Sequence, residues 1–555
     1  MPAITLGQAR LVELRPCSAQ SGRVQAVELV GAGLDAAKAL FGFDPLLSLS
    51  GAGRRWSITP AASAVGVSDL WAVTSAGISN PRRLAISPLP QILEKESNDT
   101  SESAQDVVLP LVVHGRIEPA VDLDWFVFKA RSGDRVVVTC RSLSLDGQIE
   151  PALSVFDSHG RQLAHDDGGA RDGQLCFVAP GDGHYLVRVQ ERAYRQPEAN
   201  FYALSIETGP VVVAAFPSVL TRGQSQRVTL YGYNLEPPVS GSAQLQQTTA
   251  TIAAPTEGDP DGGGWLPASA ATVDGFRYYP AQASGSVRFD LVDGDVQLEL
   301  PGDNNSGEHA QPVSIPAEIA GRFAEPRDVD WYRFAARKGQ RFWIEATGQT
   351  AGEPMDLDIT VRSAQGKVLT TLADTPQPKE KESPAWLPLD TPDPAGKFKV
   401  PEDGDYLVVI RDLYGPSLSG RRRNYHLSLV PQREAVWIVA KADSLAIKPG
   451  KSATLQLAAI RRGGHTAPIR IRAEKLPAGL SARETTLAAK ESSGSITFSA
   501  APGAAPLVAG AELVAETELE GRTARVPVRI VAAVDDGTSP RVRRCDGLPI
   551  AIIGK

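Results

Sequence analysis

The sequence predicts an all-β protein that is built from tandem β-sandwich domains. Short runs of Val, Ile, Leu, Phe and Tyr, bounded by Gly, Pro, Asp or Asn, recur along the chain, whereas amphipathic stretches with the helix period are scarce. The chain has 555 residues, including 51 Gly and 42 Pro. A single hydrophobic core rarely serves more than about 250 to 300 residues, so the strands must be divided among several cores.

An internal repeat relates two parts of the chain. The segment ELRPCSAQSGRVQAVELVGAGL, from residue 13, matches AFPSVLTRGQSQRVTLYGYNL, from residue 215, without a gap. Six turn and core positions keep a spacing of 201 residues, which predicts two related sandwiches, A and A′. These positions are Pro16, Gly22, Val27, Leu29, Gly31 and Leu34, and then Pro217, Gly223, Val228, Leu230, Gly232 and Leu235.

A second repeat, B and B′, follows each of these units. SESAQDVVLPLVVHGRIEPAVDLDWFVFKARSGDRVVV matches GEHAQPVSIPAEIAGRFAEPRDVDWYRFAARKGQRFWI at a constant spacing of 206 residues. Farther along, PGDGHYLVRV and PEDGDYLVVI are 221 residues apart, so B′ carries 15 extra residues around DTPQPKEKESPAWLPLDTPDP. This Pro-rich polar stretch predicts an exposed loop.

The repeats predict the order A–B–A′–B′, followed by a fifth sandwich and a tail. From about residue 433, runs such as VWIVAK and ARVPVRIVAA alternate with Gly/Pro turns and predict an immunoglobulin-like sandwich. After Asp535 this pattern is lost, although LPIAII has the composition of a buried strand without an obvious partner. The expected boundaries are 1–90 for A, 91–209 for B, 210–290 for A′, 291–432 for B′, 433–534 for the fifth domain and 535–555 for the tail.

Five elements of B, in this order, resemble the bacterial pre-peptidase C-terminal (PPC) domain: EKESND, DLDWFVF, SGDRVVV, PALSVFDSHGRQLAHDD and APGDGHYLVRV. This family implies a jelly-roll-like sandwich that is appended to secreted peptidases and related to clostridial collagenase collagen-binding domains. The A units are similar to the immunoglobulin-like (IPT/TIG-like) domains of plexins and transcription factors. The whole order resembles large secreted proteins that are common in planctomycete bacteria.

The bulk properties exclude some classes of function. A formal net charge of −7 and a pI near 5.7 argue against a nucleic-acid-binding surface. No apolar run approaches the roughly 18 residues of a membrane-spanning helix. The start, MPAITLGQAR, lacks the features of a signal peptide, so either the protein is cytoplasmic or its signal has been removed. The resemblance favours the second alternative and an extracytoplasmic location: secreted, periplasmic or on the cell surface.

An acidic stretch at the start of B is a candidate cation site. In an extended segment, Glu94, Glu96 and Asn98 present three oxygen ligands on one face, and Asp99 can turn inward at the bend. Asp122 and Asp124 follow at the start of an apolar strand. Burying these carboxylates together without a counter-ion would be strongly unfavourable, and calcium prefers such oxygen donors. The alternative is a solvated acidic linker in which Asp99 or Ser101 caps a turn.

The resemblance implies that this stretch binds calcium. The implied ligands are Glu94, Glu96, Asn98, Asp99 and Asp122, with Asp124 as a contributor or a neighbouring support. In B′ the spacing of 206 residues places Leu300 and Gly302 opposite Glu94 and Glu96, while Asn304, Asn305, Asp328 and Asp330 remain. We therefore expect one calcium site in B. In B′ we expect weak or absent binding, with Asp328 holding a turn.

The sequence contains no recognisable catalytic motif. None of the seven histidines lies in HExxH, and GxSxG, P-loop and dinucleotide-binding patterns are missing. Asp166 and Asp167, beside His165, occupy a hairpin tip where Asp and Gly are ordinary turn residues. We therefore predict that the protein is not an enzyme.

Cysteines and tryptophans give weaker signals. Alternation places Cys140 on a core face and Cys176 on the outer face, which argues against a disulfide between them. Trp265 and Trp386 lie in loops and could stack against a sugar or peptide, or could be apolar plugs over a sandwich edge. Trp125 and Trp331 follow the acidic turns and are expected in the core.

Together these observations predict a secreted, non-catalytic, calcium-stabilised binding or structural protein. Its expected partners are an extracellular protein, a polysaccharide or further copies of itself. The alternative is the substrate-targeting accessory portion of a secreted peptidase or glycoside hydrolase whose catalytic domain is absent from this chain.

Overall fold

The computed structural model confirms the all-β prediction. It describes residues 9–167, 171–235, 244–258, 274–300, 302, 304–325, 327–353, 355–377, 379, 383–413, 423–441, 445–535 and 540–554. In these residues the regular structure consists of strands and two short 3-10 helices, η1 (Leu143–Leu145) and η3 (Gln349–Ala351). None of the helices in this part of the chain is long and apolar enough to span a membrane.

Domain A is a two-sheet sandwich. One sheet has the order β1-β3-β6-β5, and the other has the order β2-β9-β7-β4, with β8 paired to β7. Its strands are β1 (Arg10–Arg15), β2 (Ser18–Gln20), β3 (Gln25–Ala32), β4 (Ala37–Phe41), β5 (Leu47–Ala52), β6 (Arg55–Pro60), β7 (Gly66–Thr74), β8 (Gly77–Ile78) and β9 (Arg82–Ser87).

Domain B pairs the sheet β10-β12-β19-β14-β17 with the sheet β11-β13-β18-β15-β16. Its strands are β10 (Gln91–Leu93), β11 (Gln105–Asp106), β12 (Leu111–Arg116), β13 (Asp124–Ala130), β14 (Arg135–Arg141), β15 (Pro151–Asp157), β16 (Gln162–Asp166), β17 (Gly173–Val178), β18 (Gly183–Glu191) and β19 (Phe201–Glu207).

Domain A′ is smaller in its described part, with the sheets β23-β22-β20-β25 and β21-β26-β24. Its strands are β20 (Val211–Phe216), β21 (Val219–Thr221), β22 (Ser225–Tyr233), β23 (Gln246–Ala253), β24 (Gly275–Tyr278), β25 (Ser284–Gly285) and β26 (Val287–Val292).

Domain B′ repeats the strand order of B, in the sheets β27-β29-β37-β31-β35-β34 and β28-β30-β36-β32-β33. Its strands are β27 (Val296–Leu298), β28 (Gln311–Pro312), β29 (Ala317–Arg322), β30 (Val329–Ala336), β31 (Arg341–Thr347), β32 (Leu357–Ser363), β33 (Val368–Leu372), β34 (Asp374–Thr375), β35 (Thr391–Lys399), β36 (Gly404–Asp412) and β37 (Asn424–Pro431).

The last domain joins its strands in one order, β39-β48-β45-β46-β38-β40-β44-β42, to which β41, β43 and β47 attach. Its strands are β38 (Ala435–Lys441), β39 (Leu445–Ile447), β40 (Ser452–Arg462), β41 (Ile469–Glu474), β42 (Leu480–Arg483), β43 (Thr485–Leu487), β44 (Ser493–Ala500), β45 (Leu507–Leu519), β46 (Arg522–Asp535), β47 (Pro540–Arg544) and β48 (Leu548–Ile552).

The segment that we expected to be a separate tail belongs to this last domain. β48 pairs antiparallel with β45 and parallel with β39, and Leu548, Ile550 and Ile552 are buried in the domain's core. The partner strands lie about 40 and 100 residues earlier in the chain. A local pattern therefore shows that LPIAII is a buried strand but cannot show what covers it.

Side-chain alternation sets the faces of the sheets, as in β13. Phe126 and Phe128 point into the core of B, whereas Trp125 lies on the outer face, where it packs against Phe156 and Arg188. The expectation that Trp125 is a core residue is therefore wrong, because its neighbours at even positions occupy the core. Trp331 in B′ is likewise outside the core and packs under Arg362.

The same alternation explains the cysteines. Cys140 is buried in the core of B, and Cys176 is only partly buried on the neighbouring strand. Cys176 is paired with Val137 rather than with Cys140, and both thiols are free.

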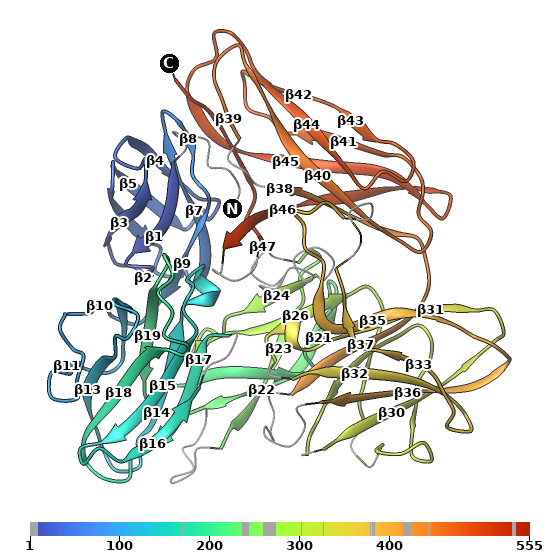
Figure 1. Cartoon of the computed structure of the whole chain (residues 1–555), viewed down its shortest axis with the longest axis horizontal. Helices are drawn as coiled ribbons and strands as arrows, with labels where there is room; N and C mark the ends of the chain where they lie inside the picture. The colour runs from blue at the N-terminus through green and yellow to red at the C-terminus, as the bar shows by residue number, and fades with distance from the viewer. Residues whose placement is uncertain are drawn as a thin grey trace.

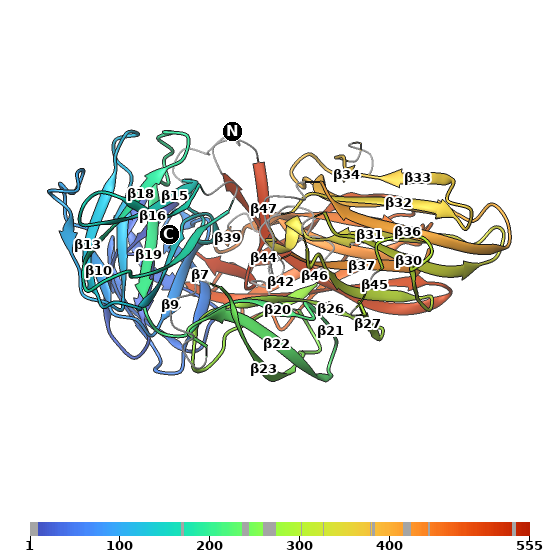
Figure 2. The ribbon, with the colours of Figure 1, turned by 90° about the horizontal axis from the view of Figure 1, so that it is seen from below.

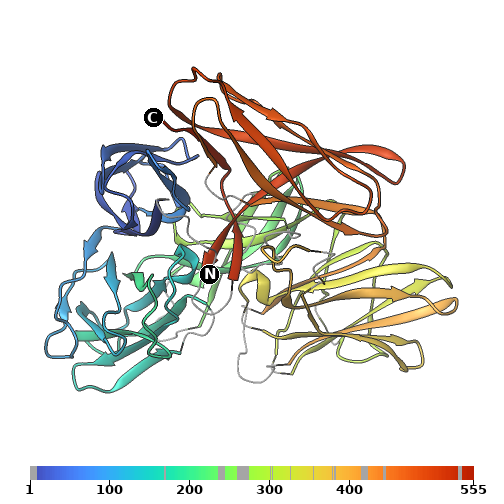
Figure 3. The same cartoon turned by 45° about the horizontal axis from the view of Figure 1, so that its top comes forward.

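The five domains lie around the middle of the molecule, and the last one returns to the first (Figures 1 and 2). Trp71 and Ile78 of domain A are part of the core that contains Ile438 and Ile550 of the last domain. Figure 3 shows the C-terminal strands, in red, running into the middle of the molecule between the other domains. The chain is therefore closed by contacts between its two ends.

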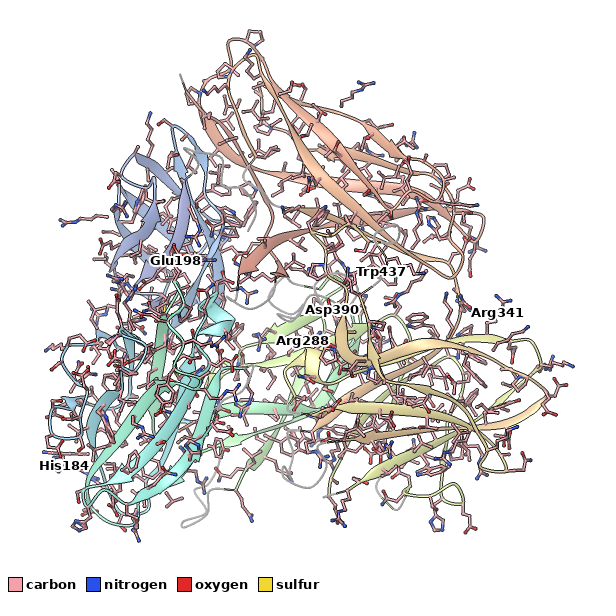
Figure 4. All side chains as sticks on the ribbon, viewed as in Figure 1. His184, Glu198, Arg288, Arg341, Asp390 and Trp437 are labelled. Carbon is pink, nitrogen blue, oxygen red and sulfur yellow. The ribbon has the colours of Figure 1, made fainter. Side chains whose placement is uncertain are left out.

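The 15-residue insertion of B′ lies at a domain interface instead of forming an exposed loop. Leu387 and Leu389 are buried in a small cluster with Val439, Ile460 and Val531 of the last domain. Figure 4 labels Asp390 and Trp437 at this junction. The insertion is polar overall, but its two leucines have an apolar partner surface that the sequence pattern did not reveal.

One arginine connects three domains. Arg543 on β47 is buried, and its Nη2 lies 2.7 Å from Oδ1 of Asp69 in domain A. Its Nε lies 2.6 Å from Oδ1 of Asp146, at the end of η1 in domain B. Both carboxylates are also buried, so this pairing brings together three charges that are withdrawn from water at once.

Arg543→Ala should loosen the closed arrangement because it leaves the carboxylates of Asp69 and Asp146 buried without a counter-charge. We expect a loss of about 3–5 kcal/mol of stability at this junction. Thermal unfolding should show an earlier first transition, and small-angle scattering should show a larger radius of gyration. Arg522→Ala, an exposed arginine of the same domain, is the control. An unchanged profile for Arg543→Ala would contradict this role.

Candidate metal centre

The strand β10 places Glu94 at the edge of B. β10 runs parallel to β12, and the pairing continues past its end because the Glu94 N–H donates to the carbonyl of His114 at 2.8 Å. The Glu94 carboxylate then accepts the Arg116 N–H at 2.9 Å through Oε2. These two bonds hold the carboxylate over the end of β12.

Asn98 ties the acidic stretch to the start of β13. Its carbonyl accepts the Trp125 N–H at 2.9 Å, and its Nδ2 donates to Oε1 of Glu94 at 3.2 Å. The Asn98 side chain is fully buried, and its Oδ1 has no hydrogen-bond partner among the described residues. A buried acceptor of this kind normally has a donor or a cation beside it.

Asp122 and Asp124 provide two more such oxygens. Oδ2 of Asp122 accepts the Glu118 N–H at 2.8 Å and closes a turn, while its Oδ1 is buried without a described partner. Oδ1 of Asp124 is in the same situation. Carboxylate oxygens of Glu94, Glu96 and Asp124 all lie within 4.8 Å of one another, which is close enough to share one ion.

The remaining predicted ligand, Asp99, is exposed at the rim, and its carboxyl group interacts with that of Asp122. The structure therefore brings together all six residues that the sequence singled out. Glu96 and Asp99 face solvent, whereas Asn98, Asp122 and Asp124 form the buried floor.

Tyr202 on β19 is a central residue of this cluster that the sequence analysis missed. Its hydroxyl lies 2.8 Å from Oε1 of Glu94 and 2.6 Å from Oδ2 of Asp124. Tyr202 fits because its cross-strand neighbour is Gly115: a Cβ at Gly115 would lie 2.2 Å from the tyrosine ring. The repeated pairs Gly115–Tyr202 and Gly321–Tyr425 were the available signal in the sequence.

The electrostatics of this cluster favour protons or a cation. Burial and the charge of Glu94 raise the pKa of Asp124 to about 10. Desolvation and the charges of Glu94 and Asp122 raise the pKa of Glu96 to about 7. Burial raises the pKa of Asp122 to about 6. The Tyr202 hydroxyl has one proton for two carboxyl groups, so one of these groups must carry a proton itself or have its charge neutralised by a cation.

The second copy differs from the expectation in its register. Glu299, and not Leu300, takes the place of Glu94, because its Oε2 accepts the Arg322 N–H at 2.7 Å. Five positions separate Glu299 from Asn304, whereas four separate Glu94 from Asn98. The spacing between the copies is therefore 205 residues at the glutamate and 206 from the asparagine onward, and a constant spacing of 206 misplaced this residue by one position.

Other contacts of the first copy recur in the second. The Asn304 carbonyl accepts the Trp331 N–H at 3.0 Å, and the Tyr425 hydroxyl donates to Asp330 at 2.6 Å. Asp328 accepts the Ala324 N–H at 2.7 Å, so the prediction that Asp328 holds a turn is confirmed. In the described part of B′, however, no three acidic groups approach one another as closely as those of B.

With this geometry established, residues 328–412 match the bacterial pre-peptidase C-terminal domain family. The match covers the larger part of B′ and confirms the resemblance for that copy. No curated protein matches the chain.

Two solved structures are similar to parts of the chain. One is the pre-peptidase C-terminal domain of a Bacillus anthracis collagenase, at 15% identity over 19% of this chain and 94% of that chain, with a TM-score of 0.16. The other is SGBP-B of the Bacteroides ovatus mixed-linkage glucan utilization locus with a mixed-linkage heptasaccharide, at 9% identity over 75% and 73%, with a TM-score of 0.12. At these TM-scores neither likeness carries an argument about function.

The structure places one of the two candidate tryptophans. Trp386 packs against the cluster of Leu387 and Val439 between B′ and the last domain, which is the position of an apolar plug. Trp265 lies outside the described residues.

The histidines that approach nucleophiles have structural surroundings. His114 lies 3.6 Å from Sγ of Cys17 and 3.0 Å from Oγ of Ser18, between domains A and B. Burial raises the pKa of the Cys17 thiol and lowers the pKa of His114 to about 3, so both groups are neutral. Near His165, Asp166 is engaged by Arg171 at 2.7 Å, as a turn residue would be.

Removing divalent cations should make the protein less stable as the pH rises from about 4 to 7. The reason is that Glu96 and Asp122 bind protons more tightly in the folded chain than in the unfolded chain, so ionisation costs stability through the pKa values of about 6 and 7. Added calcium should flatten this dependence, because it replaces the protons. Thermal melts from pH 4 to 8 with chelator or calcium measure both effects. A chelator-treated protein whose stability does not fall over this range would contradict the assignment.

Proposed function

We propose that the chain is an extracytoplasmic, non-catalytic binding or structural protein in which a calcium ion in B orders the junction between A and B. The observation that carries this proposal is the group of three buried oxygens without described partners, on Asn98, Asp122 and Asp124, beneath the carboxylates of Glu94 and Glu96. A cation would satisfy these oxygens and neutralise the carboxylates at once.

The donor set supports calcium over transition metals. All six candidate ligands supply oxygen, from five carboxylates and one amide, whereas His and Cys ligands would favour zinc or copper. Calcium accepts six to eight oxygens in flexible geometry. The mixture of a rigid buried floor and an exposed rim suits this flexibility, since Glu96 and Asp99 can adjust to the ion.

Arg116 links the cation cluster to domain A. Its backbone N–H donates to Glu94, while its guanidinium pairs with Glu13, a buried residue of A. A cation that fixes Glu94 would therefore also fix the strand end that holds this ion pair. In the second pair of domains, Arg322 donates to Glu299 and its guanidinium donates to the Tyr231 hydroxyl of A′ at 2.9 Å. Each B domain thus contacts its A domain through the residue beside its acidic cluster.

A second candidate function is supported by the family match. Domains of the pre-peptidase C-terminal family are named for their position in peptidases, so this chain can be the targeting portion of a secreted peptidase or glycoside hydrolase. The two candidates differ in their partner. Sedimentation with insoluble polysaccharide or collagen fibres would favour the targeting role, and ordered self-association without such binding would favour the structural role.

Calorimetric titration of the chelator-treated protein with calcium should show a site that the Glu94→Gln/Glu96→Gln variant loses. Glutamine keeps the size of each side chain but removes the charges that attract the ion. Glu299→Gln is the matched control in B′ and should retain this site. The proposal fails if the unmodified protein gives no binding heat and its melting temperature does not change when calcium is added.

A further inference from the structure

The strand β23 forms a bare edge of domain A′. It is the terminal strand of the order β23-β22-β20-β25 and pairs with β22 without a bulge, from Gly232–Gln246 to Ser225–Ala253. Residues 247–253 make no backbone hydrogen bond to any described residue outside β22. Figure 2 shows β23 on the outer side of the molecule, with no labelled strand beyond it.

The first copy of the same domain covers the corresponding edge. In A, β6 occupies the position of β23, and β5 pairs with its outer side over residues 47–52. The connection that supplies β5 in A runs over residues 33–54, whereas its counterpart in A′ runs over the shorter range 234–245. In the described part of A′, no strand takes the place of β5.

The composition of β23 lacks the usual protection of an edge strand. Its sequence, QQTTATIA, contains no charged residue, no proline and no glycine. Edge strands of natural proteins are commonly short, charged, bulged or interrupted by proline, because an open edge pairs readily with another strand. The other terminal strands of the described sheets are shorter, and β1, for example, carries Arg10, Glu13 and Arg15.

We propose that β23 pairs antiparallel with β23 of a second copy of this chain, joining the two A′ sheets about a two-fold axis. Identical strands can face each other only when no like charges meet, and β23 satisfies this condition over its whole length. A foreign peptide strand is normally selected by pockets for its side chains. Here the outer face of the edge presents only the exposed side chains of Gln247, Thr249, Thr251 and Ala253.

The two-fold axis restricts the register. Even-numbered residues such as Ala250 and Ile252 face the core of A′, and odd-numbered residues face outward. Opposite residues of antiparallel strands point to the same face, so the axis must pass through a residue and not between two. With the axis at Ala250, Thr249 faces Thr251 of the second copy; with the axis at Thr249, that residue faces itself. In both registers, charges at 249 and 251 would face like charges.

This restriction gives a charge-reversal test on the full chain. Sedimentation velocity should show concentration-dependent dimerisation of the unmodified protein. Thr249→Lys/Thr251→Lys and Thr249→Glu/Thr251→Glu should each weaken it by on the order of tenfold or more, because like charges meet across the axis. An equimolar mixture of the two variants should dimerise again, since opposite charges then meet. Restoration by mixing also shows that both variants are folded.

Two further variants distinguish pairing through β23 from association through another surface. Thr454→Lys/Gln456→Lys places the same charges at exposed positions of β40, an interior strand, and should dimerise like the unmodified protein. Glu94→Gln/Glu96→Gln should also dimerise, because the edge is independent of the cation cluster. Pairing through β23 is excluded if the unmodified protein is monomeric at every concentration, if the lysine variant at 249 and 251 associates unchanged, or if the mixed variants remain monomeric.

Discussion

The arrangement of the five domains depends on the pairing of Arg543 with Asp69 and Asp146. A β-sandwich can fold alone, but three buried charges from three domains are tolerated only when they meet. The apolar contacts around them reinforce the arrangement, since Trp71 and Ile78 of domain A lie in the core of the last domain. Domains that are joined by short connections alone would be free to rotate; here the final strands hold the first two domains in place.

The candidate cation cluster lies within this frame and has a different physical character. Arg543 balances its two carboxylates with protein charge, whereas in the described part of the chain no basic side chain forms an ion pair with Glu94 or Asp124. The guanidinium of the neighbouring Arg116 is directed to Glu13 of domain A. The first arrangement is complete within the chain, and the second requires protons or an ion from solution.

The two halves of the chain show how a repeat diverges while the fold is kept. B and B′ have the same strand order and the same tyrosine beside an aspartate, at Tyr202 and Tyr425. They differ in loops and surfaces, where B′ uses its insertion to contact the last domain through Leu387. A and A′ differ in the same way, because a shorter connection leaves β23 at an open edge. Divergence is thus concentrated where an element meets something outside its own sandwich.

The all-β class, the repeats and the residues of the acidic cluster follow from the order of the amino acids alone. These features depend on local alternation and on residue type, which set the face of Cys140 and the grouping of Glu94 with Glu96. The role of Tyr202, the place of Glu299, the partners of β48 and the position of Trp386 became known only from the folded chain. Each of these depends on a contact between segments that are distant in the chain, and a local pattern carries no information about which distant surface will cover it.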